Sequence, residues 1–398
     1  MRKTLGVPRF EVAARARKFL LALVVLGLAT FALGLAIDAR RTWVDYLIAL
    51  VYVTGVGLGA ALFIATQYVC GAGWSIAIRR IPEAMTSILL PSIGGVLLLC
   101  VGSGALSATV ESAGTHAAEV AVPVHEVSFR DPLLALRLLG CFLLWWVLSR
   151  SLVASSRRQD ADGDVLHTQR NVRNSALLIL FGVWTFCLAS ADLLMSLQPD
   201  WNSTIFGVLT LAGAFLASLA VLALFVVAFR RRGWTQLFTE AHVYDLGRLL
   251  LAFSIFWIYL WGSQHLLIWY SNQPEETSFY VLRHSGSWGV LSIANVLLNW
   301  LVPFGLLLTR AGRQSDRRVG AAALSILIGH WLDLYLVVAP PVLGTTPSIG
   351  PLEILPFAGA CALFVLLALR SLAHSPLVPI RDPYLIESLP DLAAAHEH

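Results

Sequence analysis

The sequence has little charge. Only 13% of its 398 residues are Asp, Glu, Lys or Arg, whereas 57% are hydrophobic and the mean hydropathy is +0.74. Soluble domains carry roughly 25% charged residues. Because the shortage extends over the whole length, the composition excludes a soluble enzyme and leaves no room for a sizeable soluble domain. The small net charge of +4 does not indicate a nucleic-acid partner.

Cysteine motifs are also missing. The five cysteines are scattered through or beside apolar runs, at Cys70, Cys100, Cys141, Cys187 and Cys361. No CxxC, CxxCH or ferredoxin-type spacing occurs, so we expect neither an iron–sulfur cluster nor a c-type haem in this chain. Free cysteines are commonly buried as small apolar side chains, which is the role expected here.

Long hydrophobic runs are abundant. A spanning helix needs about 20 predominantly apolar residues, and ten stretches qualify. They are Lys18–Ile37, Tyr46–Tyr68, Thr86–Ala108, Asp131–Arg150, Asn174–Ser196, Thr204–Phe229, Asp245–Tyr270, Ser287–Thr309, Val319–Pro340 and Leu352–Ala373. The first run is long enough to span and lacks a small-residue cleavage site, so it is interpreted as a helix rather than a signal peptide. The fold class predicted is an all-α integral membrane protein with about ten transmembrane helices, forming one polytopic domain over residues 1–398.

Charges in the loops predict the orientation. Arginines gather at the N-terminus and in the loops after the second, fourth, sixth and eighth helices, whereas the intervening loops carry mainly Asp and Glu. Loop 1–2 is mixed. Because basic residues favour the cytoplasmic side, we expect both termini in the cytoplasm, including the tail 374–398. The predicted location is the bacterial cytoplasmic (inner) membrane.

Two polar loops were considered for metal binding. The longest cytoplasmic loop, Ser151–Arg173, is interpreted as a mobile linker, and its DADGD string lacks the rest of an EF-hand pattern. On the outer side, His116 and His125 lie in a loop with three glutamates, which is better explained as solvated and partner-facing. No metal site is therefore predicted.

Polar groups inside the spans are the candidate functional residues, since burying them in a bilayer is costly. Asp192 lies near the outer end of the fifth span, and Asp333 lies in the outer half of the ninth with His330 one turn earlier. A carboxylate, an imidazole and amides near one depth could form a proton relay or accept protons from a quinol. The proton-path candidates are Asp192, Asp333, His330, His265, Asn295 and Asn299, and no catalytic residue is assigned.

Other roles for these groups stay open. Interhelical hydrogen bonds alone could explain them, and this is the favoured interpretation for the asparagines and for each histidine taken singly. Arg137, about two turns into the fourth span, is a further intramembrane charge. Only His265 and His330 lie within spans, so one bis-histidine haem is conceivable but the two-haem pattern of quinol cytochromes is not.

Several stretches resemble a known family. The segment from Ala191 to Gly207 is similar to the D-x-x-M-S-L-x-P-x-W-x-S-T-x-x-G signature of membrane subunits of alternative complex III. Ser263–Glu276, Gly329–Tyr335 and the tail Arg381–Leu389 resemble the smaller, ActF-type subunit of that complex. The resemblance covers helices 5–10 and the tail, and helices 1–4 carry only general similarity.

The resemblance implies a member of the NrfD/polysulfide reductase membrane-subunit superfamily. That family has two four-helix bundles flanked by helices 1 and 10, and the small residues Gly55, Gly57, Gly59, Gly207 and Gly213 weakly suggest such a repeat of helices 2–5 and 6–9. Implied partners are an ActC-type sister subunit, an iron–sulfur subunit, multihaem c-type cytochromes and, in some complexes, a terminal oxidase. Quinol or menaquinol is the implied substrate of the complex, with haem c and iron–sulfur clusters in partner subunits and none in this chain.

In this family the ActF-type subunit is regarded as a cofactor-free partner that conducts protons, and it is also described as facing quinone. Asp192 and Asp333 match the family motifs. His265 departs from them, because the family usually has an aromatic or aliphatic residue there. Three alternatives remain: a stand-alone secondary transporter, a purely structural membrane anchor, and direct quinol oxidation within this chain.

Overall fold

The computed structural model describes residues 10–102, 131–198, 201–344 and 346–389. In this part of the chain, ten helices are long and apolar enough to cross a membrane, and no strand occurs. The prediction of an all-α, multi-pass membrane protein is therefore confirmed. The third span is interrupted by a 3-10 turn at Thr86–Ile88, and the eighth by the π-helical segment η5 (Leu297–Leu301).

The spanning helices are α1 (Ala14–Ile37), α2 (Ala39–Val69), α3 with α4 (Arg80–Met85 and Leu89–Gly102), α6 (Pro132–Asp162), α7 (Leu166–Leu193), α8 (Phe206–Arg231), α9 (Glu240–Ser271), α11 with α12 (Gly286–Val296 and Val302–Leu307), α14 (Asp316–Val338) and α16 (Pro351–Ala373). The shorter helices are η1 (Gly73–Ser75), η4 (Met195–Leu197), α10 (Pro274–His284), α13 (Arg310–Gln314), α15 (Pro340–Leu343) and α17 (Leu385–Ser388).

Two helices, α2 and α8, form the centre of the molecule. Nearly all of α2 is buried, and it contacts α7, α8 and α16, while α8 also contacts α9 and α14. Glycines allow this close packing: a Cβ added to Gly59 would lie 2.7 Å from the Ser218 Cβ, and one added to Gly55 would lie 3.0 Å from the Ala214 Cβ. Small residues at such crossings let membrane helices approach closely, so the helix-2 glycines have a packing role.

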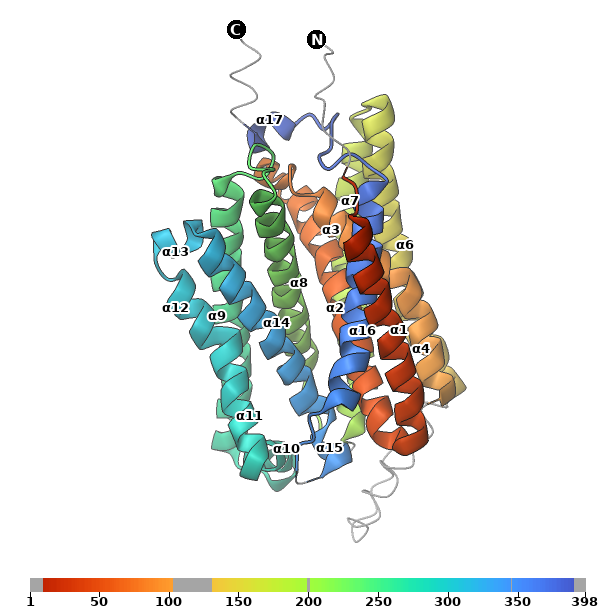
Figure 1. Cartoon of the computed structure of the whole chain (residues 1–398). Coiled ribbons are helices and arrows are strands. Elements are labelled where there is room, and N and C mark those ends of the chain that lie inside the picture. The colour runs from red at the N-terminus through yellow and green to blue at the C-terminus, as the bar shows by residue number, and fades with distance from the viewer. Residues whose placement is uncertain (1–9, 103–130, 199–200, 345, 390–398) are drawn as a thin grey trace.

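Around this centre, α3/α4, α6 and α7 pack with α2 in a first bundle, and α9, α11/α12 and α14 pack with α8 in a second. Figure 1 shows the second bundle at the left and the first at the right. Helices α1 and α16 lie side by side against the first bundle. Their backbones touch where Gly27 meets Gly359, since a Cβ on Gly27 would lie 2.8 Å from the Gly359 Cα.

The segment after α16 packs against one end of the bundle, which we call the arginine-rich end. This end carries α17 at the top of Figure 1 and α13, with Arg310 and Arg313, at the upper left. Asp382 of this segment forms a buried ion pair with Arg79. Ser388 Oγ donates to the Trp74 carbonyl at 2.7 Å and accepts from the Ala77 amide at 3.0 Å. The His242 Nε2 lies 3.0 Å from the same oxygen. The tail therefore joins the α2–α3 connection to α9.

The prediction of a mobile linker at Ser151–Arg173 is wrong. Helix α6 continues to Asp162, α7 begins at Leu166, and Gly163 ends α6 in the left-handed conformation with φ 74°. The two extensions are held together by polar contacts, such as Gln159 Nε2 donating to Thr168 Oγ at 2.8 Å. Hydropathy did not reveal them because both helices project beyond the apolar layer.

Candidate functional site

The most connected of the candidate polar residues form a chain in the second bundle. Asn299 Nδ2 donates to Asn295 Oδ1 at 2.6 Å, and Asn295 Nδ2 donates to Asp333 Oδ1 at 2.8 Å. Both asparagines are buried, and Asp333 is half-buried. The structure thus brings Asp333 of α14 together with the pair of asparagines on the eighth span.

The π segment explains how the two asparagines face α14. From Asn295 onward, the buried positions on the eighth span lie four residues apart, at Asn295, Asn299, Pro303 and Leu307. This spacing exceeds the 3.6 residues of an α-helical turn, and a wider π turn keeps such positions on one face. Single π turns inside helices occur frequently at functional sites.

The backbone groups freed by this irregularity are satisfied by neighbouring helices. Pro303 has no N–H, which leaves the Asn299 carbonyl without its usual partner. Ser254 Oγ of α9 donates to that carbonyl at 2.7 Å, and Ser325 Oγ of α14 donates to the adjacent Leu298 carbonyl at 2.8 Å. Within a bilayer such groups must find protein partners, so α9 and α14 hold the interrupted span in place.

His330 lies one turn from Asp333 on α14 and is buried. Its ring packs against the Tyr52 ring of α2, with centroids 5.1 Å apart. A Cβ added to Gly213 would lie 3.1 Å from His330 Nδ1 and 3.6 Å from Asp333 Oδ2. Both side chains therefore face α8 at Gly213, and His330 Nδ1 has no hydrogen-bond partner among the described residues.

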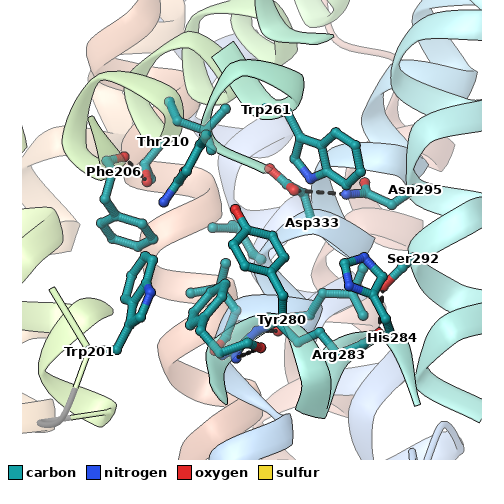
Figure 2. Close-up of a pocket in the computed structure, with 16 residues that line it drawn as sticks. Trp201, Phe206, Thr210, Trp261, Tyr280, Arg283, His284, Ser292, Asn295 and Asp333 are labelled. Carbon is teal, nitrogen blue, oxygen red and sulfur yellow. Dashed lines mark hydrogen bonds between the residues drawn. The ribbon is translucent and has the colours of Figure 1, made fainter. Parts of the chain in front are cut away.

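A cavity of about 60 Å³ adjoins Asp333, with room for a few water molecules. Helices α8, α9, α10, α11 and α14 contribute its lining. Figure 2 shows Asp333 and Asn295 on one side and the Tyr280 ring projecting into the same space. Thr210 and Gln264 add further polar side chains. The carboxylate can therefore meet water held in this cavity, which lies beside α10 at the end of the bundle opposite the arginine-rich end.

Arg283 of α10 also lines the cavity, and the groups to which it donates hydrogen bonds are neutral. The buried guanidinium donates to the Leu336 and Val337 carbonyls of α14 at 2.7 and 2.8 Å, and to Gln198 Oε1 at 3.1 Å. It also lies 3.4 Å from the centre of the Phe279 ring. Burial lowers the pKa of Arg283 to about 9, so it remains positively charged at pH 7. The charge stands at the same cavity as Asp333.

His265 belongs to an aromatic cluster beside the cavity. Its ring stacks on Trp261 at 5.4 Å and meets the edges of Tyr280 and His284 at 4.8 and 5.0 Å. His265 and His330 pack against different sets of neighbours. Since Trp261, Tyr280 and His284 line the cavity, His265 lies behind its wall.

Asp192 occupies a different setting, in the first bundle. Arg137 of α6 donates to it twice, from Nε to Oδ2 at 2.7 Å and from Nη2 to Oδ1 at 2.6 Å. The Asp192 side chain is 9% exposed and that of Arg137 is 48% exposed. Asp192 and Asp333 therefore have separate partners, and spacing along the two spans did not predict the ion pair between Asp192 and Arg137.

The sequence analysis missed the contribution of α10. Tyr280, Arg283 and His284 all lie on this short helix, which is not hydrophobic enough to span and falls between the predicted spans Asp245–Tyr270 and Ser287–Thr309. Its signals are nevertheless present: Pro274 at the first position, Glu275 and Glu276 in the first turn, and Arg283 and His284 in the last. Such a charge distribution is typical of a helix with complemented ends.

The loop containing His116 and His125 lies outside the described residues. Elsewhere, Asp162 accepts from the Asp164 amide at 3.0 Å and lies 2.8 Å from His167 Nε2. Over the described ranges, no group of three or more His, Cys, Asp or Glu side chains is placed to hold a metal ion.

The fold and this site define a multi-pass α-helical membrane protein with a polar chain and a small cavity inside its second bundle. Comparison of the sequence with models of known protein families and with curated proteins finds no match.

Proposed function

We propose that this chain is a membrane subunit of a quinol-oxidising respiratory complex of the alternative complex III type, and that it provides a path for protons. The observation that carries the proton path is the hydrogen-bonded series Asp333–Asn295–Asn299 at the edge of a cavity. The resemblance of the sequence motifs to ActF-type subunits supports the choice of complex.

Each side chain of the series has a chemical role in the proposal. Asp333 is the proton carrier, because a carboxyl group can bind and release a proton, whereas amides cannot. Asn295 donates to this carboxylate and thereby fixes its orientation. Asn299 fixes the orientation of Asn295. His330 lies one turn away on α14, and its Nδ1 has no hydrogen-bond partner in the described part of the chain, so it is the next group that can exchange a proton with Asp333.

Asp192 has a smaller part in this proposal than the sequence suggested. A carboxylate that accepts from both Nε and Nη2 of one arginine is fixed in position by a bidentate ion pair. Asp192 is therefore better suited to holding α6 and α7 together than to releasing and taking up a proton. Asp192→Asn provides a matched comparison for Asp333→Asn, since both remove one carboxylate from the outer half of a span.

The test uses the intact complex in sealed membrane vesicles supplied with quinol. We expect Asp333→Asn to preserve assembly and quinol oxidation while reducing the number of protons moved per electron. Asp192→Asn should leave this ratio unchanged. An unchanged ratio in Asp333→Asn, at normal quinol turnover, would show that the carboxylate carries no protons.

Membership of the complex is tested by purification through a tag on this chain in mild detergent. Multihaem cytochromes and an iron–sulfur subunit should be recovered with it. Recovery of the chain alone and colourless would instead favour the secondary transporter. Transporters of that class commonly interrupt corresponding helices in their two halves. Here the interrupted spans are the third and the eighth, which do not correspond in a repeat of helices 2–5 and 6–9.

A further inference from the structure

Three arginines gather around one tyrosine at the arginine-rich end of the second bundle. The guanidinium carbons of Arg248, Arg310 and Arg313 lie 5.7, 6.0 and 5.5 Å from the centre of the Tyr244 ring. Tyr244 and Arg248 are one turn apart on α9, and the other two arginines belong to the short helix α13. Segments distant in sequence thus bring their charges to one place.

The packing of α13 on α9 fixes this arrangement. A Cβ added to Gly247 would lie 3.1 Å from the Arg313 Cβ and 3.2 Å from its Cα, so the absence of a side chain at Gly247 favours this close approach of the two backbones. Arg313 Nη1 also donates to the carbonyls of Leu307 and Leu308 at 3.0 and 2.9 Å. Arg313 is therefore anchored by the fold, and Arg248 and Arg310 extend beside it as exposed side chains.

The cluster carries more positive than negative charge. Asp245 lies 3.3 Å from Arg248, and the nearby Asp316 is already paired with Arg230 at 3.0 Å. Among the described residues, no carboxylate forms an ion pair with Arg310 or Arg313. Cations that share one aromatic ring repel one another, and an anion between them would offset that repulsion.

Apolar side chains continue from the cluster along the same surface. Ile255 follows Arg248 by two turns on α9, about 10 Å further into the membrane at 1.5 Å per residue, and is 42% exposed. Leu308, beside α13, is 54% exposed, and Leu301 on the same span is 45% exposed. An anion bound at the arginines would therefore have hydrocarbon-compatible surface directly beneath it.

We propose that Tyr244, Arg248, Arg310 and Arg313 form a binding site for the phosphate of an anionic phospholipid, whose acyl chains lie along α9 and α12. Basic clusters at the cytoplasmic ends of membrane helices attract acidic lipids through their headgroups, and arginine suits phosphate because its planar donors match the oxygens. A free phosphate ion would offer the arginines the same oxygens as a lipid headgroup. The apolar surface below the arginines favours the lipid, because it can hold the acyl chains. This inference does not depend on the respiratory role.

The test measures thermal unfolding of the full chain in a neutral detergent while phosphatidylglycerol, phosphatidylcholine or inorganic phosphate is added. We expect phosphatidylglycerol to raise the unfolding temperature in a saturable manner, and the other two to have little effect. Equal effects of phosphatidylglycerol and phosphatidylcholine would overturn the site, because the headgroup charge would not matter. An equal effect of inorganic phosphate would overturn the lipid assignment.

Variants locate the site. Arg248→Gln with Arg310→Gln should weaken phosphatidylglycerol binding about thirtyfold, from the loss of two surface arginines. The matched control is Arg317→Gln with Arg318→Gln, which removes the same charge from exposed positions on α14 and should bind as the unchanged protein does. Equal weakening by both pairs would contradict a defined site and indicate general attraction to basic charge. If the Arg248→Gln, Arg310→Gln double variant does not fold, the comparison of the three additives on the unchanged protein still tests whether an anionic lipid binds.

Discussion

Arg137 and Asp192 join α6 to α7 through two parallel hydrogen bonds, Nε to Oδ2 at 2.7 Å and Nη2 to Oδ1 at 2.6 Å. The geometry matches the planar fork of the guanidinium to both oxygens of the carboxylate. Because the arginine is about half exposed and the aspartate nearly buried, the pair lies at the surface of the first bundle. It is an intramembrane charge pair with an evident structural role.

A double-mutant cycle should measure this role. Arg137→Gln leaves a nearly buried carboxylate without its main partner, and we expect it to destabilise the protein more than Asp192→Asn does. The coupling between the two changes should be about 1–2 kcal/mol, reduced from the fully buried case by the exposure of the arginine. Denaturation of the single and double variants in mixed detergent gives the value. Purely additive effects would mean that the contact contributes nothing.

Gly329 should be required for the Asp333–Asn295–Asn299 series. A Cβ at this position would lie 2.6 Å from Asn299 Nδ2 and 2.7 Å from its Cγ, so Gly329→Ala must displace the amide. We expect a loss of about 1–3 kcal/mol in the free energy of unfolding, together with reduced proton movement. Gly305→Ala on α12 is the control, since its Cβ would meet no atom within 4 Å. It should be neutral or stabilise the helix by up to about 1 kcal/mol. Equal behaviour of the two variants would show that Asn299 is not constrained as described.

Arg283 should not be replaceable by lysine. Its guanidinium reaches carbonyls on both α10 and α14 as well as Gln198, which a single ammonium group cannot do with the same geometry. Arg283→Lys should cost about 3 kcal/mol from the lost charge-assisted bonds. Faster hydrogen exchange in α10 would locate the effect there. Arg232→Lys changes an exposed position just after α8 and should alter neither the free energy of unfolding nor hydrogen exchange in α10. If α10 exchanges as slowly in Arg283→Lys as in Arg232→Lys, the prediction is wrong.

Ser388 should fix the tail to the arginine-rich end. Its hydroxyl donates to the Trp74 carbonyl and accepts from the Ala77 amide. Because His242 Nδ1 accepts from the Thr239 amide at 3.0 Å, the His242 proton lies on Nε2 and is donated to Ser388 as well. Ser388→Ala should therefore cost about 2 kcal/mol, since it leaves buried groups without partners.

Hydrogen exchange should increase both in residues 73–78 and in α17 of the Ser388→Ala protein. The exposed Ser278, whose hydroxyl only bonds the Glu275 carbonyl three residues earlier, provides the control as Ser278→Ala. If exchange rises in α17 alone, the tail is not coupled to the α2–α3 connection.

The ten spans could be predicted from the sequence because a bilayer demands about 20 apolar residues from each helix. The predictions were wrong or incomplete for helices that lie outside the apolar layer. The polar extensions of α6 and α7 into Ser151–Arg173 and the amphipathic α10 have no hydropathy signal. Their helical ends are instead determined by local features, such as the left-handed Gly163 and the proline and acidic residues that begin α10.

The candidate site was predictable one residue at a time but not as an arrangement. Asp333, Asn295 and Asn299 could be named because polar groups within spans are costly. Which helices face one another depends on packing, so neither the hydrogen bond from Asn295 to Asp333 nor the pairing of Arg137 with Asp192 followed from spacing. Arg283 was overlooked because its helix does not cross the membrane.

The π segment Leu297–Leu301 holds one residue more than regular α-helical turns would accommodate, and one residue corresponds to about 100° of rotation. This extra residue therefore keeps Trp288 and Asn295 on the same face of the span as Leu307. Deleting any one residue of the segment would shorten the span by only about 1.5 Å but would turn Trp288 and Asn295 away from α14, toward the lipid. This stretch should therefore tolerate substitutions at its lipid-facing positions far better than it tolerates a change in length.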